Sequence, residues 1–413
     1  MTRSLSLIRT LHIEAAEDGT SGGSHRSLHD LVTGLRPFGV IPTVLFNEGN
    51  PFVERLASKG IDVHVWEDMR TSERKALRRL PSALRLIPAI RFLLRRARFL
   101  GRNPFDIVHL NNSPHTGHTD WLPATLIRRI PCLASMRGDA TLVPSPRQTV
   151  IFRGFRRIVP VSTYVARSPT CRALPAERIT VIPNGVDLER LRGASLNPAQ
   201  RQELRSKVGL RPPQDFLAVM AGTVRRWKGQ LNAVRALAQL PRPDLNRLKL
   251  ILAGGWGPSD ESYVRRIRTL VQETGLEGHV SLLGRRKDIP ELFSAADVAV
   301  HASTTPEPFG LVVVEAMATG TPVLAAAGGG PAEILEEGGG LLHDPENPQE
   351  LADRLSELMR DPSLRTRLSE EAYRIADTYS IERTRREMAR LYHDLLSRPF
   401  PGNSEGSSGQ PAT

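Results

Sequence analysis

The chain has 413 residues, of which 40% are hydrophobic, and carries a formal net charge of +12. A chain of this length usually folds as two domains of about 200 residues each, and the mixed composition is that of a soluble globular protein. No run of about 18 apolar residues indicates a membrane span, and Arg9 and His12 interrupt the apolar start, which is unlike a secretory signal. Two cysteines, Cys132 and Cys171, offer neither a disulfide framework nor a metal-ligand spacing, so we expect a cytoplasmic protein.

The first half of the chain alternates predicted strands with predicted helices. A strand over residues 5–13 leads through a loop ending in Gly22 and Gly23 to a helix over 24–35 and a strand over 39–46. Backbone N–H groups of this turn could approach a phosphate, although the full G-x-G-x-x-G pattern is absent. Further strands are predicted at 61–66, 106–111, 131–136, 157–161 and 179–183. Further helices are predicted at 51–60, 84–100 and 121–129.

Most of the positive charge lies in residues 70–102, which contain eleven Arg or Lys residues and one acid, Glu73. Within this segment, residues 84–100 combine a broad apolar stripe with Arg on the other side, a composition typical of a helix lying on an anionic membrane surface. A solvated surface helix of an α/β domain has the same composition. Nucleic acid is disfavoured as a partner, because no aromatic platform or reading motif accompanies the charges.

Polar side chains gather where the strands of the first half end. In a parallel sheet wound with right-handed crossovers, ligands bind at the carboxyl ends of the strands. His109 and Asn111 lie at the end of one predicted strand and Arg137 follows the next. His115 and His118 lie in the loop between them, where a plain surface position is the alternative. These five residues are therefore candidates for one side of a ligand cleft.

The second half repeats the alternation after a linker over residues 188–213. A strand over 216–221 is followed by a glycine-bounded loop that carries Arg225, Arg226 and Lys228. Basic side chains clustered after a strand are typical of a pyrophosphate clamp, with a solvated basic loop as the alternative. The later strands are predicted at 248–253, 280–283, 298–301 and 323–326, the second of them leading to Arg285. Helices are predicted at 230–240, 263–274, 289–295, 348–359, 364–378 and 381–397, and one more is expected to begin at Glu333. Residues 399–413 are rich in Pro, Gly and Ser and should be disordered.

Two carboxylates, Glu307 and Glu315, flank a predicted loop-to-helix junction. Pro308 presets the backbone for a helix start and Gly310 lets a ligand approach the main chain. The helix over 311–318 would then offer free N–H groups and its positive dipole end to an anion. Glu315 falls on an apolar face, which is costly unless something bonds to it. The alternatives are a simple N-terminal acid with a satisfied buried Glu, or an acid/base pair.

The order and spacing of several short motifs make the chain resemble the family 4 retaining glycosyltransferases. Each motif alone is weak, but together they span more than a hundred residues in the family's order. The motifs are Ile-Pro-Asn184-Gly-Val-Asp187, Trp227-Lys228-Gly229-Gln230, Asp288-Ile-Pro, Ala295-Ala296-Asp297-Val298, Glu307-Pro-Phe-Gly-Leu-(x)3-Glu315-Ala-Met-Ala, Gly320-Thr-Pro-Val and Gly340-Leu-Leu.

The resemblance implies an α/β protein with the GT-B fold, in which two Rossmann-like domains face each other across a cleft. Residues 1–190 would form the N-terminal acceptor domain, completed by a C-terminal helix over 380–398 that crosses back to it. Residues 191–379 would form the C-terminal nucleotide-sugar donor domain.

The resemblance also implies retaining transfer of a sugar from a nucleotide-diphosphate donor to a glycan, lipid-linked or other hydroxyl acceptor, without a metal or other cofactor. Lys228, with Arg225 or Arg226, would stabilise the leaving diphosphate. Glu307 would hold sugar hydroxyls and Glu315 would accept the ribose hydroxyls. The other donor contacts would be Gly22, Gly23, Thr223, Arg226, Arg285, Phe309, Gly310 and Leu311.

Two positions depart from the family pattern. Thr223 stands where many members have the Arg of a Gly-Arg-Leu turn, so the second cation of the clamp would have to be Arg225 or Arg226. Arg137 stands where many members have His, so a catalytic role of that His does not transfer, and Arg137 would hold the acceptor or a phosphate instead. These departures leave open an alternative function, a non-catalytic nucleotide-sugar-binding protein acting in assembly or regulation. For the enzyme, we expect polysaccharide biosynthesis in the cytoplasm, with peripheral contact between residues 84–100 and the inner face of an anionic membrane.

Overall fold

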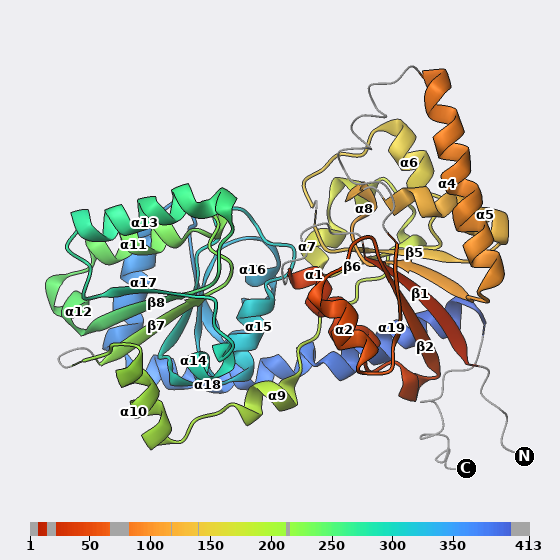
Figure 1. The fold of residues 1–413 in the computed structure, drawn as a ribbon. Coiled ribbons are helices and arrows are strands. Elements are labelled where there is room, and N and C mark those ends of the chain that lie inside the picture. Colours follow the sequence, from red (N-terminus) through yellow and green to blue (C-terminus); the bar gives the residue numbers. More distant parts are fainter. Residues whose placement is uncertain are drawn as a thin grey trace, which may run out of the picture. The chain divides into compact units, whose positions relative to one another are not determined.

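The structure is a computed structural model that describes residues 7–14, 22–66, 82–116, 118–138, 140–211 and 215–397. The side chains of residues 82–89, 116 and 118 are not part of the description. The chain divides into two compact α/β units (Figure 1). Unit 1 comprises Met1–Gly185 and Ile381–Thr413, and unit 2 comprises Val186–Ser380. The tail over 399–413, predicted to be disordered, lies outside the described residues, as does the first part of the basic segment.

Unit 1 is built on a six-stranded sheet with the strand order β3-β2-β1-β4-β5-β6, in which every neighbouring pair is parallel. This is the order of a doubly wound Rossmann sheet, with the topological switch between β1 and β4. The strands are β1 (Ile8–Glu14), β2 (Val40–Phe46), β3 (Asp62–Val65), β4 (Ile107–Leu110), β5 (Cys132–Met136) and β6 (Arg157–Pro160). The central strands β4 and β5 are buried along their whole length, which is why they read as continuous runs with few charges.

The strand predicted at 179–183 is not present as such. The structure has a single bridge there, between Ile158 and Ile179. Thr180 and Ile182 donate backbone hydrogen bonds to Ile158 and Pro160. The pairing stops at Pro183, which has no N–H to donate.

The helices of unit 1 connect these strands, and α19 crosses back to it from the end of the chain. They are α1 (Gly23–Val32), α2 (Pro51–Ala57), α4 (Ser82–Arg102), α5 (Leu122–Arg128), α6 (Pro146–Phe152), α7 (Thr163–Ala166), α8 (Pro169–Arg172) and α19 (Ile381–Leu395). In Figure 1, α4 and α6 both lie at the top of this unit.

The C-terminal helix α19 is part of the core of unit 1, as the sequence predicts. Met388 and Tyr392 are buried in the same apolar cluster as residues of β1, β4 and β5. Arg385 donates two hydrogen bonds to the carbonyl of Asp30, at 2.6 and 2.9 Å. A Cβ at Gly34 would lie 2.3 Å from the Arg385 guanidinium carbon, so the glycine makes room for this contact.

Unit 2 repeats the same architecture with the strand order β12-β11-β10-β7-β8-β9, again with all neighbours parallel. Its strands are β7 (Phe216–Ala221), β8 (Leu248–Ala253), β9 (Val280–Gly284), β10 (Val298–His301), β11 (Val323–Ala326) and β12 (Gly340–His343). Its helices are α9 (Leu188–Gly193), α10 (Pro198–Lys207), α11 (Gln230–Gln239), α12 (Arg242–Arg247), α13 (Glu261–Glu273), α14 (Ile289–Ala295), α15 (Leu311–Ala318), α16 (Gly329–Leu335), α17 (Pro348–Arg360) and α18 (Pro362–Ile375). The switch point falls between β7 and β10, where a ligand is expected in such sheets.

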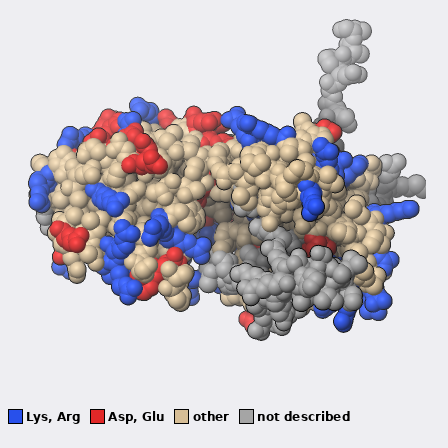
Figure 2. Space-filling view, turned by 90° about the horizontal axis from the view of Figure 1, so that it is seen from above, with Lys and Arg blue, Asp and Glu red and all other residues tan. Residues whose placement is uncertain are grey.

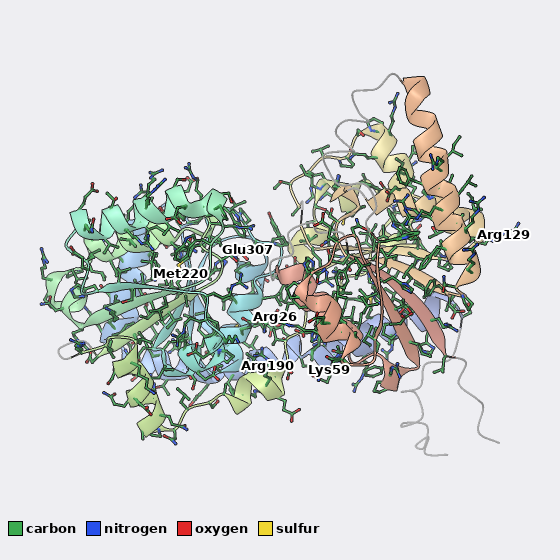
Figure 3. All side chains as sticks on the ribbon, in the orientation of Figure 1. Arg26, Lys59, Arg129, Arg190, Met220 and Glu307 are labelled. Carbon is green, nitrogen blue, oxygen red and sulfur yellow. The ribbon has the colours of Figure 1, made fainter. Side chains whose placement is uncertain are left out.

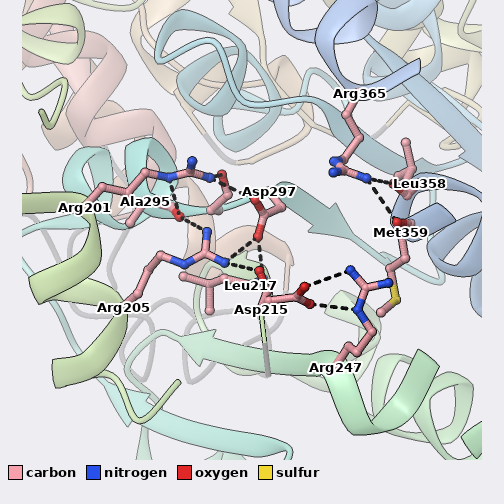
Figure 4. Close-up of polar contacts among 11 residues, drawn as sticks. Arg201, Arg205, Asp215, Leu217, Arg247, Ala295, Asp297, Leu358, Met359 and Arg365 are labelled. Atoms are coloured by element: carbon pink, nitrogen blue, oxygen red, sulfur yellow. Dashed lines mark hydrogen bonds and ion pairs between the residues drawn. The ribbon is translucent and has the colours of Figure 1, made fainter. Parts of the chain in front are cut away.

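The predicted linker over 188–213 contains α9 and α10, and arginines of α10 bind Asp297 (Figure 4). Arg201 and Arg205 each contact one carboxylate oxygen of Asp297 at 2.9 Å. The same carboxylate accepts a 2.7 Å hydrogen bond from the backbone N–H of Leu217 at the start of β7. The acid of the Ala295-Ala296-Asp297 motif therefore fastens α10 to the sheet of unit 2.

The helix α16 begins at Gly329, four residues before the predicted start at Glu333. Gly329 and Gly330, the first residues of α16, are packed against the segment before α15. A Cβ at Gly330 would lie 2.3 Å from the carbonyl oxygen of Phe309, and the Gly330 N–H donates to the carbonyl of Glu307 at 2.8 Å. This close approach requires glycine.

None of the helices in the described part of the chain combines the length and the apolar character needed to cross a bilayer.

Candidate functional site

The loop after β7 places Lys228 at the switch point of unit 2. A 3₁₀ turn over Arg226–Lys228 ends at Gly229, whose φ of 76° is left-handed. A Cβ at Gly229 would lie 1.8 Å from the carbonyl oxygen of Ala302, so the loop can reach β10 only with glycine there. The N–H of Thr304 donates to the carbonyl of Trp227 at 2.8 Å. The loop that carries Lys228 is thereby joined to the segment that leads into Glu307.

Three side chains donate to one oxygen of Glu307. Lys228 Nζ lies 2.6 Å from Glu307 Oε1, and His301 Nε2 lies 2.7 Å from the same oxygen. Ser303 Oγ is the third donor. Glu307 has 8% of its surface exposed, and its position between the loop and the start of α15 is marked in Figure 3. Among the described residues, every hydrogen bond to this carboxylate goes to Oε1.

The Glu307 carboxylate stays ionised in this cluster. Burial by itself raises the pKa of a carboxyl, but the charge and hydrogen bond of His301, and then those of Lys228, outweigh it and hold the pKa of Glu307 well below its ordinary value of 4.5. Glu307 and Lys228 therefore form a buried ion pair, with His301 beside the same carboxylate oxygen. Such a pair can exchange partners with a ligand that carries both phosphate and hydroxyl groups.

The N-terminus of α15 follows directly. Gly310 caps the helix with a φ of 99°, and a Cβ there would lie 2.8 Å from the Cγ of Pro331. The side chain of Phe309 is buried and makes an edge contact with Tyr379, with ring centroids 5.7 Å apart. The Phe309 side chain is therefore engaged in packing within unit 2. Glu315 lies in the second turn and is buried, with 7% of its surface exposed.

The other predicted donor residues of unit 2 lie on more exposed positions. Arg225 lies 3.9 Å from Asp260, so its guanidinium is turned to that carboxylate. Arg226 and Thr223 are exposed, and the Thr223 carbonyl accepts a 3.2 Å hydrogen bond from Gln230. Exposed Arg285 lies beside Gly255. The structure therefore brings Lys228 to Glu307, whereas a direct part for Arg225 stays a prediction.

In unit 1, a second polar cluster lies where β1 and β4 end. The carboxylate of Glu14 accepts hydrogen bonds from the side chains of Asn111 and Asn112. Asn111 also donates to the carbonyl of Ser24, in the first turn of α1, at 3.2 Å. Gly22 and Gly23 stand just before that residue, as the cap and first residue of α1. The glycine turn and Asn111 thus share one edge of the sheet.

Arg137, after β5, joins this edge to the Asn-Gly-Val-Asp motif. Its Nε donates to the carbonyl of Asn111 at 3.0 Å, and its Nη1 donates to the side chain of Asn184. Burial lowers the pKa of Arg137 to about 10, against the opposing effect of Glu14 and Tyr392, so the guanidinium remains charged at neutral pH. Among the described residues, the hydrogen bonds of Arg137 involve Nε and Nη1 and none involves Nη2.

His109 lies inside unit 1, where it connects three elements. Its Nδ1 lies 2.6 Å from the hydroxyl of Tyr392 on α19, and its Nε2 lies 2.9 Å from the hydroxyl of Ser135 on β5. Burial, followed by the nearby His12 and Arg137, lowers the pKa of His109 well below 6.5. Contact with an acceptor would require the ring to leave both partners. The geometry therefore favours a packing role for His109.

The two predicted loop histidines differ in what the structure describes. His115 Nε2 lies 2.7 Å from the hydroxyl of Thr170, and its ring meets Phe152 edge-on at 5.0 Å. It fastens α6 and α8 to the loop after β4. His118 begins a 3₁₀ turn, His118–Trp121, and its side chain lies outside the described residues.

His301, Ser303, Glu14 and Asn184 are site residues that sequence reasoning did not select. The rule that strand ends carry ligands would have found His301 at the end of β10 and Glu14 at the end of β1. Nothing in the spacing announces Ser303, because its contact with Glu307 arises only from the turn of the loop. Within the described ranges, no three His, Cys, Asp or Glu side chains are grouped as a metal site would require.

Two doubly wound units, each with a polar cluster at the carboxyl edge of its sheet, define the GT-B class of glycosyltransferases. The family model "Glycosyl transferases group 1" matches residues 201–375, and the model "Glycosyltransferase Family 4" matches residues 21–190. The chain belongs to the family 4 glycosyltransferases.

Known proteins resemble the chain over much of its length. Spore coat protein SA of Bacillus subtilis is 30% identical over 294 residues, which cover 68% of this chain and 75% of that protein. D-inositol 3-phosphate glycosyltransferase of Corynebacterium glutamicum is 32% identical over 228 residues, covering 54% of this chain and 53% of that protein. This chain thus spans about half the length of the second relative. The crystal structure of Anabaena HepE in complex with UDP and glucose has 25% identity and a TM-score of 0.76, covering 94% of this chain and 100% of that chain.

Proposed function

We propose that the protein is a retaining glycosyltransferase that moves a sugar from a nucleoside-diphosphate donor to a hydroxyl acceptor without a metal ion. The observation that carries the proposal is the Lys228–Glu307 pair, 2.6 Å apart, at the N-terminus of α15. This arrangement sets a cation, an anion and a helix dipole within one site of unit 2.

The charges match what glycosyl transfer needs. As the bond between the sugar carbon and the diphosphate breaks, positive charge develops on the sugar and negative charge on the leaving phosphate. Lys228 would turn from Glu307 to that phosphate, with the N–H groups of Gly310 and Leu311 beside it. Glu307 would then accept hydrogen bonds from sugar hydroxyls. Glu315 would accept the ribose hydroxyls, and Arg226 and Arg285 would stay near the diphosphate and base.

The acceptor would bind at the carboxyl edge of the unit 1 sheet. Arg137 offers Nη2, and Asn111 holds a buried Oδ1 with no hydrogen-bond partner among the described residues. Both groups are held in place by the contacts with Glu14 and Asn184, so they are preorganised to bind hydroxyls or an anionic group of a glycan or lipid-linked acceptor. Diphosphate contacts by Gly22 and Gly23 remain part of the proposal.

A donor screen tests this function. Because Anabaena HepE was solved with UDP and glucose, UDP-glucose is the first donor to try. Sugar transfer and released nucleoside diphosphate are measured together, with and without EDTA. Turnover that needs added Mg²⁺ would remove the metal-free part of the proposal. Tight nucleoside-diphosphate binding with no transfer to any acceptor extract would favour the non-catalytic alternative.

Peripheral membrane contact through residues 84–100 also remains a proposal. The exposure of its side chains limits which residues of this segment could contact lipid. Arg96 is buried, pairs with Asp120 at 2.8 Å and lies over the ring of Trp121 at 5.3 Å. This arginine is therefore not available to lipid. Exposed Ile90 and Leu94 lie one turn apart on α4, with exposed arginines at 91 and 98 beside them.

A further inference from the structure

Unit 1 exposes four aliphatic side chains on α6 and in the loop before it. The exposed fractions are 76% for Val143 and 68% for Val150, with 45% for Leu142 and 43% for Ile151. Scattered single aliphatic residues are common on protein surfaces, but four within ten residues are not. We call Leu142, Val143, Val150 and Ile151 the α6 patch.

The α6 patch lies on a helix and a turn that are fixed by capping and loop hydrogen bonds. Ser145 caps α6 and Gln148 completes a capping box, with Pro146 as the first helical residue. The hydroxyl of Thr170 donates to the carbonyl of Leu142 at 3.2 Å. On the opposite side of α6, Phe152 is buried against His115. The apolar side chains are therefore presented outward by a fixed helix and turn.

Along the chain, the charged residues between Asp139 and the exposed Glu177 are all basic. Residues 140–176 contain six Arg and neither Asp nor Glu. Arg147 lies three and four residues before Val150 and Ile151, so these side chains share one face of α6. Arg153 and Arg156 are exposed just beyond the helix. Figure 2, which looks down on the side where α6 lies in Figure 1, shows blue side chains outnumbering red ones on this unit.

This combination favours a lipid surface over a protein partner. Protein interfaces rely on aromatic side chains and on matched hydrogen bonds, and the α6 patch has only aliphatic side chains. An aliphatic patch with arginines beside it fits a bilayer that carries anionic headgroups. The aliphatic side chains enter the boundary of the acyl chains, while the guanidinium groups remain with the phosphates.

We infer that the α6 patch, with Arg147, Arg153 and Arg156, docks unit 1 on an anionic membrane. This site uses other residues than the α4 segment and does not depend on glycosyl transfer. Arg137 lies only five residues before Leu142, at the end of β5. Docking would therefore bring the proposed acceptor edge of unit 1 towards the lipid surface, where a lipid-linked acceptor is found.

Co-sedimentation of the full chain with vesicles tests the inference. Vesicles of phosphatidylcholine alone are compared with vesicles that also contain phosphatidylglycerol. We expect binding only to the anionic vesicles, and release at high salt. The double variant Val143→Asp, Val150→Asp should weaken binding by about tenfold or more, because two carboxylates would have to enter the interface. The triple variant Arg147→Gln, Arg153→Gln, Arg156→Gln, which changes only exposed side chains, should also weaken it.

The matched control is Leu126→Asp, Ile127→Asp on α5, where two aliphatic side chains are 58% and 59% exposed. The control should bind like the unchanged chain. Equal vesicle binding by the Val143→Asp, Val150→Asp variant, absence of binding by the unchanged chain, or an equal loss in the control would each overturn the inference. The rise in melting temperature with UDP, measured without vesicles, reports on nucleotide binding independently, so a failed membrane result leaves the proposed function untouched.

Discussion

Replacing Glu307 separates its structural part from its chemical part. Glu307→Ala removes the acceptor of His301 and Ser303, whose exposed fractions are 5% and 3%, and frees Lys228 from its counter-charge. Two buried donors left without an acceptor cost about 3 kcal/mol together. A loss of 1 kcal/mol lowers the melting temperature of a unit of this size by about 2–4 °C, so Glu307→Ala should lower that of unit 2 by about 6–12 °C.

Glu307→Gln keeps an oxygen at the same place. It should cost only about 1 kcal/mol, because the two buried donors retain an acceptor. Both variants should lose about a hundredfold or more in turnover, since neither keeps the charge that holds Lys228 and the sugar. Scanning calorimetry and a transfer assay give the two readouts, with Glu337→Ala on the exposed turn after α16 as control.

The pH dependence of stability gives a further test, because the pKa of Glu307 is lowered by folding. A carboxylate whose pKa is depressed by folding contributes stability above its ordinary value of 4.5 and loses that contribution as the pH falls below it. The unchanged chain should therefore lose stability below about pH 4.5 more steeply than Glu307→Gln does. Equal melting temperatures for the Ala and Gln variants, or equal acid slopes, would refute the three-donor cluster.

Three further variants test other parts of the structure. Gly229→Ala should destabilise unit 2 by about 3 kcal/mol. Gly275 also has a positive φ, but a Cβ there would meet no atom within 4 Å, so Gly275→Ala should cost only about 1 kcal/mol. Equal costs in a denaturant titration would contradict the close approach of Gly229 to Ala302. Burial, followed by Arg137, lowers the pKa of His12 to about 3, so this residue contributes about 1.4 kcal/mol per pH unit to the loss of stability of unit 1 as the pH falls from 6.5 towards 3. His12→Gln should therefore make that loss less steep. An unchanged slope would count against a neutral buried ring. Arg137→Ala should raise the KM for the acceptor with little change in nucleoside-diphosphate affinity, and Arg137→Lys should restore part of it; a loss of nucleotide affinity instead would place Arg137 on the donor side.

The fold could be predicted from the sequence because the residues that end its helices and strands are visible in short stretches of the chain. Gly310 and Gly320 mark the ends of α15, and the alternation of apolar strands with helices recurs in both units. The start of α16 could not be predicted, because three consecutive glycines resemble a loop. Gly329 and Gly330 begin α16 where the carbonyls of Glu307 and Phe309 approach too closely for a Cβ, a contact between separate segments.

The central residues of the site could be predicted from the sequence, but the contacts of its other side chains could not. Lys228 and Glu307 stand out by motif, and the structure brings them together. That Arg225 faces Asp260 instead depends on how the loop after β7 folds. The pattern of the 84–100 helix places Arg96 among the solvated arginines, yet it is buried against Asp120 and Trp121. A partner 24 residues away cannot be seen in a helical pattern.

The measurement that most directly tests the central proposal is turnover of a nucleoside-diphosphate sugar by the unchanged chain, Glu307→Gln and Lys228→Ala under identical conditions. Transferred sugar and released nucleoside diphosphate are quantified together, and the anomeric configuration of the product is read by NMR. We expect transfer with retention by the unchanged chain and loss of about a hundredfold or more in both variants. Undiminished turnover in either variant, or an inverted product, would contradict it.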